Sequence, residues 1–245
     1  MSKANKSYSL LNPVLFAGGL ILLAGFAIRA SFGVFQIPIE NEFGWLRADF
    51  SLAIAIQNLS WGVGQPLFSM IAEKFGDRKA IFLGALLYAI GLLLSSYAIT
   101  PLAHQFLEII VGFGMAGTGF GVVLAVVGRA ISENKRSLAL GIATSVGSLG
   151  QIVGPPLIEK LLQHLAWQEV FVVMAITIFS VILLLPLIKS EQTLASSEND
   201  LSMSDVLVKA LKDPSFTMIM LGFFSCGFQI LAQELGNEES LVLIV

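Results

Sequence analysis

Ionisable side chains stand inside long apolar runs of this sequence, where charge is costly. Arg29 lies in the first run, and Glu108 lies in the fourth, four residues after His104. Residues spaced by four share one face of a helix. Arginine can bind an anion through its planar fork of donors, and a buried carboxylate can take up a proton. Gln57 and Asn58 add amides to the second run, either as substrate contacts or as interhelical hydrogen bonds.

Motifs that support enzymatic chemistry are missing from the sequence. It contains no His-Glu-x-x-His, no Gly-x-Ser-x-Gly and no Walker phosphate loop. The single cysteine, Cys226, excludes a disulfide framework and a cysteine metal site. We expect both histidines, His104 and His164, to be interfacial side chains near the outer surface. The sequence predicts no enzyme, no cofactor, no metal site and no nucleic-acid partner.

Composition indicates what kind of elements must position these residues. The 245 residues are 56% hydrophobic and 13% charged, whereas soluble domains are about 25% charged. One soluble core cannot bury this much apolar sequence, so the chain is expected to cross a membrane several times. The first apolar run is too long for the core of a signal peptide. We expect a multi-pass protein of the plasma (inner) membrane.

Seven apolar runs approach or reach the length of a membrane-spanning helix, so the predicted fold is all-α. They lie roughly at 13–38, 50–71, 80–100, 103–128, 138–158, 168–188 and 215–232. The acidic residues Glu40 and Glu42, together with Pro38, are expected to end the first helix. The predicted divisions are a six-helix unit at 1–189, a cytoplasmic linker with a short amphipathic helix (204–212) at 190–213, a partial seventh helix at 214–232 and a tail at 233–245.

The positions of lysine and arginine predict the orientation, because cytoplasmic loops of membrane proteins are enriched in both. With the N-terminus inside, eleven Lys and Arg residues fall in inner segments and only Arg47 and Lys160 fall in outer loops. The N-terminus is therefore expected to be cytoplasmic.

A short charged segment, 69–79, separates the second and third runs and reads Ser-Met-Ile-Ala-Glu-Lys-Phe-Gly-Asp-Arg-Lys. Charges between two apolar runs predict a tight loop at the membrane surface. The segment resembles the signature loop of the major facilitator superfamily, Gly-x-Leu-Ala-Asp-Arg-Phe-Gly-Arg-Arg. The matching residues are Ile71, Ala72, Glu73, Lys74, Phe75, Gly76, Arg78 and Lys79, with Asp77 inserted. Residues 31–45, followed by Arg47 and Ser51, resemble the monocarboxylate and oxalate/formate branch.

The resemblance implies a six-helix bundle made of a 3+3 inverted repeat, which forms one half of a transporter that alternates access. The tetrapeptides Gly-Gln-Pro-Leu at 64–67 and Gly-Pro-Pro-Leu at 154–157 agree with such a repeat. The resemblance also implies that Glu73 braces the inner face closed. Its expected basic partners are Lys74, Arg78 and Arg129. The alternative is that the charges of this loop only fix the topology.

Glycine and proline patterns mark the fourth and fifth runs. Gly112, Gly114 and Gly117 have the spacing of a nucleotide-binding loop, but they lie inside an uncharged run. A nucleotide loop follows a strand and opens a helix, so we expect close helix packing instead. The segment 150–156, which ends in Gly154, Pro155 and Pro156, resembles a motif of antiporters in the superfamily. It should bend the helix, and it slightly favours antiport over symport.

The predicted function is gradient-driven transport of small organic solutes of the monocarboxylate type. The expected partners are the substrate, a coupling proton and the lipid bilayer. The family likeness ends near residue 230, so we expect a truncated chain that lacks a C-terminal half or pairs with a second copy. The alternative is a non-transporting scaffold or receptor with the same fold.

Arg29 is the predicted anion contact. It lies about nine residues before the outer end of the first run, roughly 13 Å deep, where an arginine costs at least ~2.5 kcal/mol. The resemblance implies that the first and fourth helices line a central cavity, so Arg29 could meet Glu108. Helical side chains lean toward their own N-terminus, which directs these two apart. We expect Arg29 to be open to a carboxylate and Glu108 to be shallower in the membrane and available for protonation. The alternative is a static ion pair between the two.

Overall fold

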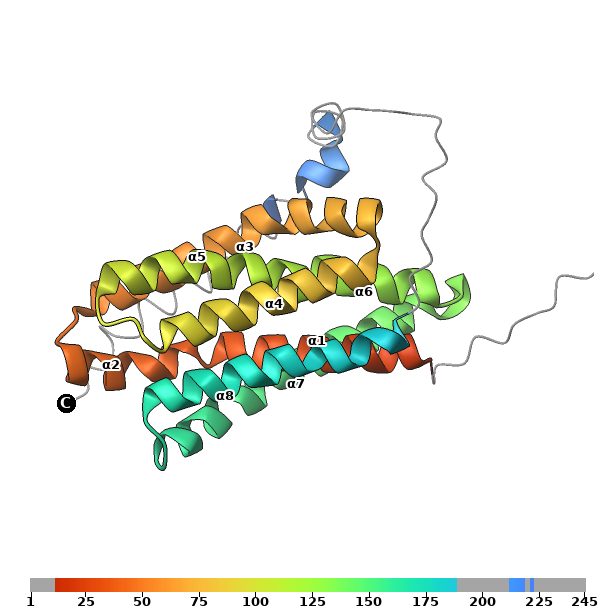
Figure 1. Cartoon of the computed structure of the whole chain (residues 1–245). Coiled ribbons are helices and arrows are strands. Elements are labelled where there is room, and N and C mark those ends of the chain that lie inside the picture. The colour runs from red at the N-terminus through yellow and green to blue at the C-terminus, as the bar shows by residue number, and fades with distance from the viewer. Residues whose placement is uncertain (1–11, 189–211, 219–220, 223–245) are drawn as a thin grey trace, which may run out of the picture. The chain divides into compact units, whose positions relative to one another are not determined.

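The computed structural model describes residues 12–188, 212–218 and 221–222, and these form helices and turns without any strand (Figure 1). The all-α prediction is therefore confirmed. The chain divides into two units, 1–193 and 194–245. The helices of the first unit are, in order, α1 (Pro13–Ala30), η1 (Phe32–Phe35), α2 (Gln36–Phe43), α3 (Arg47–Phe75), α4 (Asp77–Ser95), α5 (Pro101–Thr118), α6 (Phe120–Ala130), α7 (Glu133–Leu162), α8 (Trp167–Ser180) and η2 (Val181–Leu187).

The first predicted span consists of three helical segments, α1, η1 and α2. The Asn12 side chain caps α1 by accepting a hydrogen bond from the Val14 backbone N–H at 2.9 Å. Pro38 does not end the helix, because α2 continues to Phe43, but the helix does end one residue after the second of the two predicted acidic residues, Glu40 and Glu42. Pro38 lies in the first turn of α2, where a missing N–H costs little. Gly44 ends α2 with a φ of 67°, which glycine adopts without strain.

Six segments of membrane-spanning length correspond to the first six predicted runs. Five of them are long and apolar enough to cross a membrane. The sixth is α3, which has 29 residues but carries the polar side chains of Gln57, Asn58 and Gln65. Of the predicted seventh span only 215–218 and 221–222 are described, and these residues are helical. The amphipathic helix predicted at 204–212 lies outside the described residues apart from Lys212.

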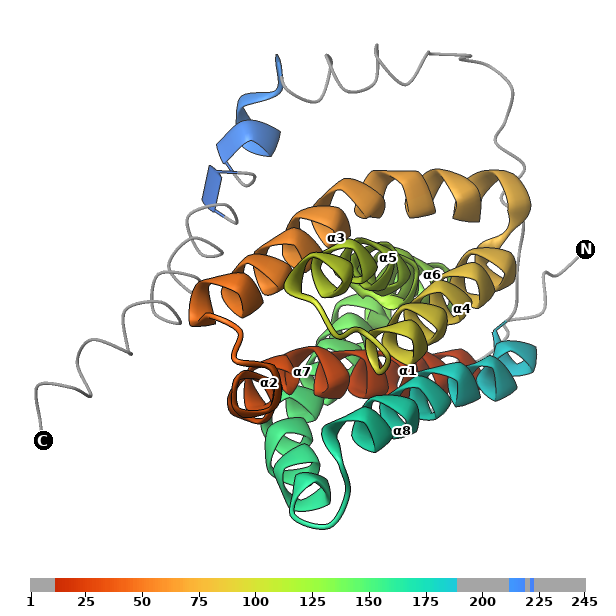
Figure 2. The ribbon, with the colours of Figure 1, turned by 60° about the vertical axis from the view of Figure 1, so that its left-hand side comes forward.

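The spans form two sets of three, and helices of one set pack between helices of the other (Figure 2). The first set is α1, α3 and α4, and the second is α5 with α6, α7 and α8. α1 packs most extensively against α7, and α5 packs most extensively against α3 and α4. These contacts join the first span to the fifth and the fourth span to the second. The two contacts are equivalent if spans four to six repeat spans one to three. Gly64 of α3 packs against Ala116 of α5, and Gly154 of α7 packs against Ala27 of α1. The two glycines of the repeated tetrapeptide thus occupy corresponding positions in the 3+3 repeat.

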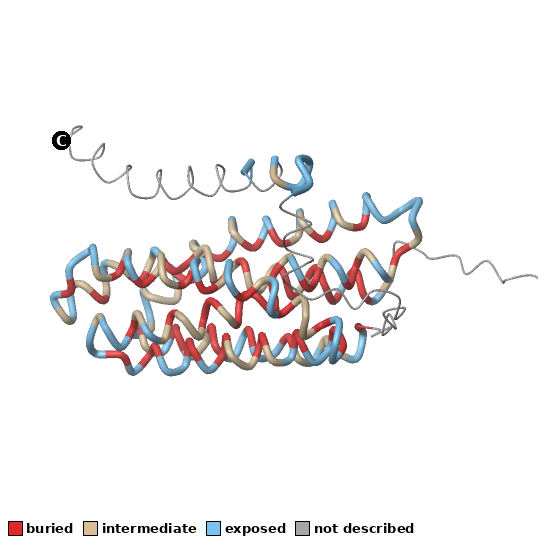
Figure 3. Tube along the Cα trace, turned by 90° about the horizontal axis from the view of Figure 1, so that it is seen from above, coloured by how far each residue is buried: buried red, intermediate tan, exposed pale blue. Residues whose placement is uncertain are grey.

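Small residues allow close approach inside the bundle, where buried residues line the helix faces that meet (Figure 3). A Cβ atom on Gly112 would overlap the backbone of Gln57 in α3, and one on Gly114 would overlap the backbone of Tyr88 in α4. Both glycines lie within the continuous helix α5, so their spacing serves helix packing. The helix α7 also continues without interruption through Pro155 and Pro156.

Candidate functional site

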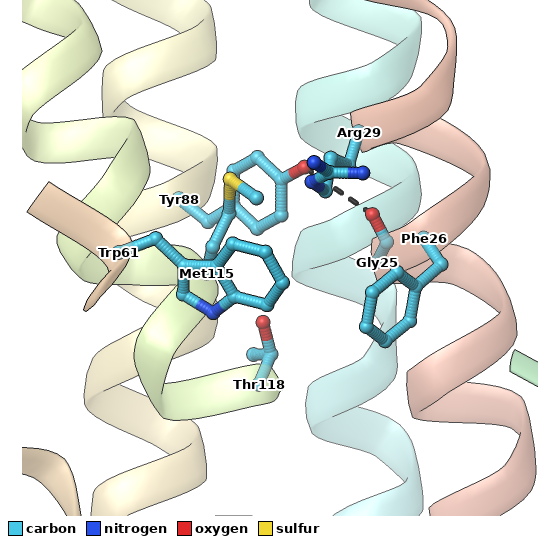
Figure 4. Close-up of a pocket in the computed structure, with 7 residues that line it drawn as sticks. All are labelled: Gly25, Phe26, Arg29, Trp61, Tyr88, Met115 and Thr118. Carbon is cyan, nitrogen blue, oxygen red and sulfur yellow. Dashed lines mark hydrogen bonds between the residues drawn. The ribbon is translucent and has the colours of Figure 1, made fainter. Parts of the chain in front are cut away.

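A small pocket of about 10 Å³, partly open to the surroundings, lies between α1, α3, α4 and α5 (Figure 4). Its lining residues are Gly25, Phe26, Arg29, Trp61, Tyr88, Met115 and Thr118. Two interruptions of the spans flank it. α1 ends one residue after Arg29, and α5 ends at Thr118, where Gly119 separates it from α6. Discontinuous helices of this kind form substrate sites in secondary transporters.

Arg29 is half-buried and extends from α1 into this pocket (Figure 4). Its Nη2 donates a hydrogen bond to Asn58 Oδ1 at 3.1 Å, and its guanidinium carbon lies 5.1 Å from the centre of the Trp61 ring. The Arg29 Nε and the Trp61 Nε1 are buried without a hydrogen-bond partner among the described residues. No described carboxylate forms an ion pair with Arg29. The lining of the pocket therefore includes a cation without an acidic partner and two buried donors without hydrogen-bond partners among the described residues.

Glu108 is fully buried between α5, α3 and α4. Gln57 Nε2 donates to its Oε2 at 2.5 Å, and Ser95 Oγ donates to its Oε1 at 3.5 Å. Close packing around the α5 glycines encloses this carboxyl, and its depth in the membrane relative to Arg29 stays a prediction. No ion pair joins it to Arg29 within the described part of the chain. The two are linked instead through Gln57 and Asn58, which are neighbours on α3.

His104 is only 1% exposed within the bundle. Its location near the outer membrane surface stays a prediction. Aromatic rings from the 44–46 turn, from α3 and from α8 surround it and account for its burial. Those rings belong to Trp45, Phe50 and Phe171. His164, by contrast, is exposed after the end of α7.

The signature loop (69–79) is helical except at Gly76, the single residue that joins α3 to α4. Its φ of 97° and ψ of 148° are unfavourable for any residue with a Cβ. Asp77 therefore begins α4, and its Oδ1 accepts from Arg129 Nη2 of α6 at 2.5 Å. The expected pairing of Arg129 with Glu73 is wrong, because Asp77 is buried beside Arg129 while Glu73 is exposed.

The other basic residues of the signature loop take separate positions. Arg78 donates from Nε to the Ile188 backbone oxygen and from Nη2 to the Pro186 oxygen at 3.2 Å. These bonds attach the start of α4 to the end of η2. Lys74 and Lys79 are exposed. Within the described residues, Glu73 has no hydrogen bond or ion pair.

Sequence reasoning missed several residues that the structure brings to these sites. Trp61, Tyr88, Met115 and Thr118 line the pocket, but single aromatic, thioether or hydroxyl side chains in apolar runs carry no sequence signal. Tyr88 donates a hydrogen bond from its hydroxyl to the Gly25 backbone oxygen at 3.3 Å (Figure 4). The signal for Asp77 was present, because it stands as an extra acidic residue in a basic loop.

Comparisons with known proteins agree with this architecture. Monocarboxylate transporter 13 of Bos taurus is 37% identical over 152 residues, which cover 58% of this chain and 33% of that protein. Monocarboxylate transporter 12 of Homo sapiens is 27% identical over 185 residues, covering 71% and 35%. The uncharacterized MFS-type transporter YcxA of Bacillus subtilis is 26% identical over 183 residues, covering 73% and 42%. The chain thus spans about a third of the length of these curated relatives.

A solved structure shares the fold at low sequence identity. The peptide transporter POT in complex with sulfate superimposes with a TM-score of 0.63 and 16% identity, covering 89% of this chain and 46% of that chain. The family model described as Major Facilitator Superfamily matches residues 17–236. The helical repeat, the signature loop and this match together identify the chain as a member of the Major Facilitator Superfamily.

Proposed function

We propose that the bundle forms one half of a secondary active transporter for small organic anions of the monocarboxylate type. The observation that carries this proposal is Arg29. It is a half-buried cation with no acidic partner among the described residues, and its Nε has no hydrogen-bond partner there. Burying charge and donors without partners is costly, so an anion that enters the pocket recovers that cost.

The lining of the pocket favours a carboxylate with a small apolar body. Guanidinium donors match the two oxygens of a carboxylate in a fork geometry. Trp61 Nε1 offers another unpaired donor, while Phe26 and Met115 offer apolar surface. The names of relatives, monocarboxylate transporters 12 and 13, support the same substrate class.

Charge balance supports coupling to a proton at Glu108. Tyr88 lies within electrostatic reach of both Glu108 and Arg29, so these two charges act on one region. An anion bound at Arg29 adds negative charge to this region, and a buried carboxylate close to added negative charge binds a proton more readily. Linkage makes the effect reciprocal, so a protonated Glu108 favours anion binding. Gln57 and Asn58 act as positioning residues on α3 for the two groups.

Alternating access requires a second bundle to close the open side of the pocket. We assign this role to a second six-helix half or to a second copy of this chain. Glu73 is exposed on the signature loop without a partner in the described residues, which suits contact with that second bundle. The bias of basic residues supports a cytoplasmic N-terminus, with the loop at the inner face of the plasma membrane.

Counterflow in proteoliposomes tests the proposal. If a second copy of the chain supplies the second bundle, vesicles loaded with unlabelled lactate should accumulate labelled lactate transiently when they contain the parent protein. Arg29→Ala should abolish this accumulation. Parent chain that binds lactate without counterflow would show that the second bundle is needed. Parent chain that neither binds nor transports any of a panel of small monocarboxylates would contradict the proposal and favour a non-transporting scaffold.

A further inference from the structure

A buried titratable pair lies on α5 outside the lining of the pocket. His104 and Glu108 are 1% and 0% exposed, and His104 Nε2 lies 3.7 Å from Glu108 Oε1. Neither ring nitrogen of His104 has a hydrogen-bond partner in the described residues. A neutral imidazole always carries one N–H donor and one acceptor nitrogen. Packing alone therefore leaves a buried donor unsatisfied, which native interiors avoid.

Aromatic rings form much of the surroundings of His104. The Phe50 ring stacks on it at 5.7 Å with an interplanar angle of 17°, and the Trp45 ring lies 5.7 Å away. The Phe171 ring lies at 6.2 Å. Aromatic faces at about this distance attract a cation. A protonated His104 thus has aromatic neighbours on several sides and one carboxylate at the next turn of its own helix.

We propose that His104 and Glu108 together bind one proton, which moves between His104 Nε2 and Glu108 Oε1. In one form the imidazolium faces the carboxylate, and in the other a neutral imidazole faces the carboxylic acid. The transfer breaks one N–H bond and forms one O–H bond, so the pair stays neutral. This site deepens the proposed proton coupling and rests on it for its purpose, but it can be tested without any substrate.

Other groups near the pair leave this route open. On α3, Gln57 donates to Oε2 of Glu108, which leaves Oε1 to His104 and the 3.5 Å bond from Ser95 on α4. Tyr88 on α4 and Arg29 on α1 form no ion pair or hydrogen bond with Glu108 among the described residues.

Three carboxylates at the same end of the bundle are engaged elsewhere. Asp49 of α3 accepts from the Leu46 backbone N–H at 3.3 Å, and Glu42 of α2 accepts from Trp167 Nε1 at 2.5 Å. Glu169 of α8 accepts from the Ala166 backbone N–H at 2.9 Å. None of these carboxylates pairs with His104 in the described structure.

The location of His104 gives the pair a direction. His104 lies in the first turn of α5, between Glu108 and the end of the helix at Pro101. In the proposed orientation this end faces outward, so protons from the outer side would reach Glu108 through the imidazole. The proposal therefore separates two tasks, with Arg29 binding the anion and the His104–Glu108 pair binding the proton.

The sequence offers a clean spectroscopic test, because it contains only two histidines. Protein labelled with 15N-histidine, purified in lipid nanodiscs without substrate, should give two imidazole signals. The His164→Gln variant, which alters an exposed residue, assigns the remaining signal to His104. Infrared spectra of the same samples follow the carboxylic acid band, which is assigned by its loss in Glu108→Gln.

A shared proton predicts that the His104 signal and the Glu108 carboxyl band change at the same apparent midpoint, because coupled sites titrate as a pair. A His104 signal that stays constant while the carboxyl band titrates would make His104 a spectator and overturn the proposal. So would two unrelated midpoints. Failure of lactate binding with a shared midpoint would instead count against the proposed substrate.

Discussion

The ion pair between Asp77 and Arg129 gives the sharpest test of the structure around the signature loop. The Asp77→Asn variant keeps the size of the side chain and removes its charge. The Asp77 side chain is 6% exposed and that of Arg129 is 40% exposed. A fully exposed pair contributes about 0.2–1 kcal/mol, and breaking a fully buried pair costs about 3–5 kcal/mol. With one buried and one partly solvated partner, we expect a loss of about 1.5–2 kcal/mol in the free energy of unfolding.

Part of this loss belongs to the helix and part to the ion pair. Asp77 lies in the first turn of α4, where an acidic side chain contributes about 0.3–1 kcal/mol through the helix dipole. The double variant with Arg129→Gln isolates the pair, and we expect a coupling energy of ~1 kcal/mol. The total loss corresponds to a change of roughly 10- to 30-fold in the unfolding equilibrium constant.

Unfolding of the purified chain in mixed micelles, followed by circular dichroism, measures these differences. The matched control is Glu73→Gln, which removes an acidic charge four residues earlier from a side chain that has no partner among the described residues. The control should change stability by no more than about 0.5 kcal/mol. Equal losses for Asp77→Asn and Glu73→Gln, or a coupling energy near zero, would refute the reasoning.

Three further substitutions test the packing and the turns. Gly114→Ala should lower the free energy of unfolding by about 1–3 kcal/mol, because its Cβ would overlap the Tyr88 backbone. The control Gly62→Ala, with open space around the site, should cause no loss, and thermal unfolding compares the two variants. Gly76→Ala should lower stability by about 1–3 kcal/mol in the same assay, since its φ is 97°. Trp167→Phe should lower the free energy of unfolding by about 1 kcal/mol, because it removes the hydrogen bond to the exposed Glu42. Hydrogen exchange in α2 should then become faster, and unchanged exchange would contradict this attachment.

Much of the architecture was predictable because lipid imposes simple rules on sequence. Long apolar runs gave the positions of six helical segments, and the spacing of small residues predicted close packing at Gly112 and Gly114. The run through Pro38 shows where this reasoning fails. Hydropathy does not report that α1 stops at Ala30, since a change from α to 3-10 geometry alters hydrogen bonds and leaves composition the same.

The candidate site was less predictable, because it depends on which helix faces meet. The position of Arg29 deep within the first apolar run predicted that its side chain faces the interior of the bundle. In the structure, Arg29 lines a pocket. Burial of His104 comes from aromatic rings on three other segments, which spacing along α5 cannot reveal. The partner of Arg129 depends on the one-residue turn at Gly76, which turns Asp77 inward.

Equilibrium binding of labelled lactate to the purified chain tests the central claim most directly. The parent should bind saturably, Arg29→Lys should bind at least about tenfold more weakly because an ammonium lacks the guanidinium fork, and Arg29→Ala should not bind measurably. Lys135→Ala removes an exposed cation from the start of α7 and should bind as the parent does. Binding by Arg29→Ala with the affinity of the parent would contradict the assignment of Arg29 as the anion contact.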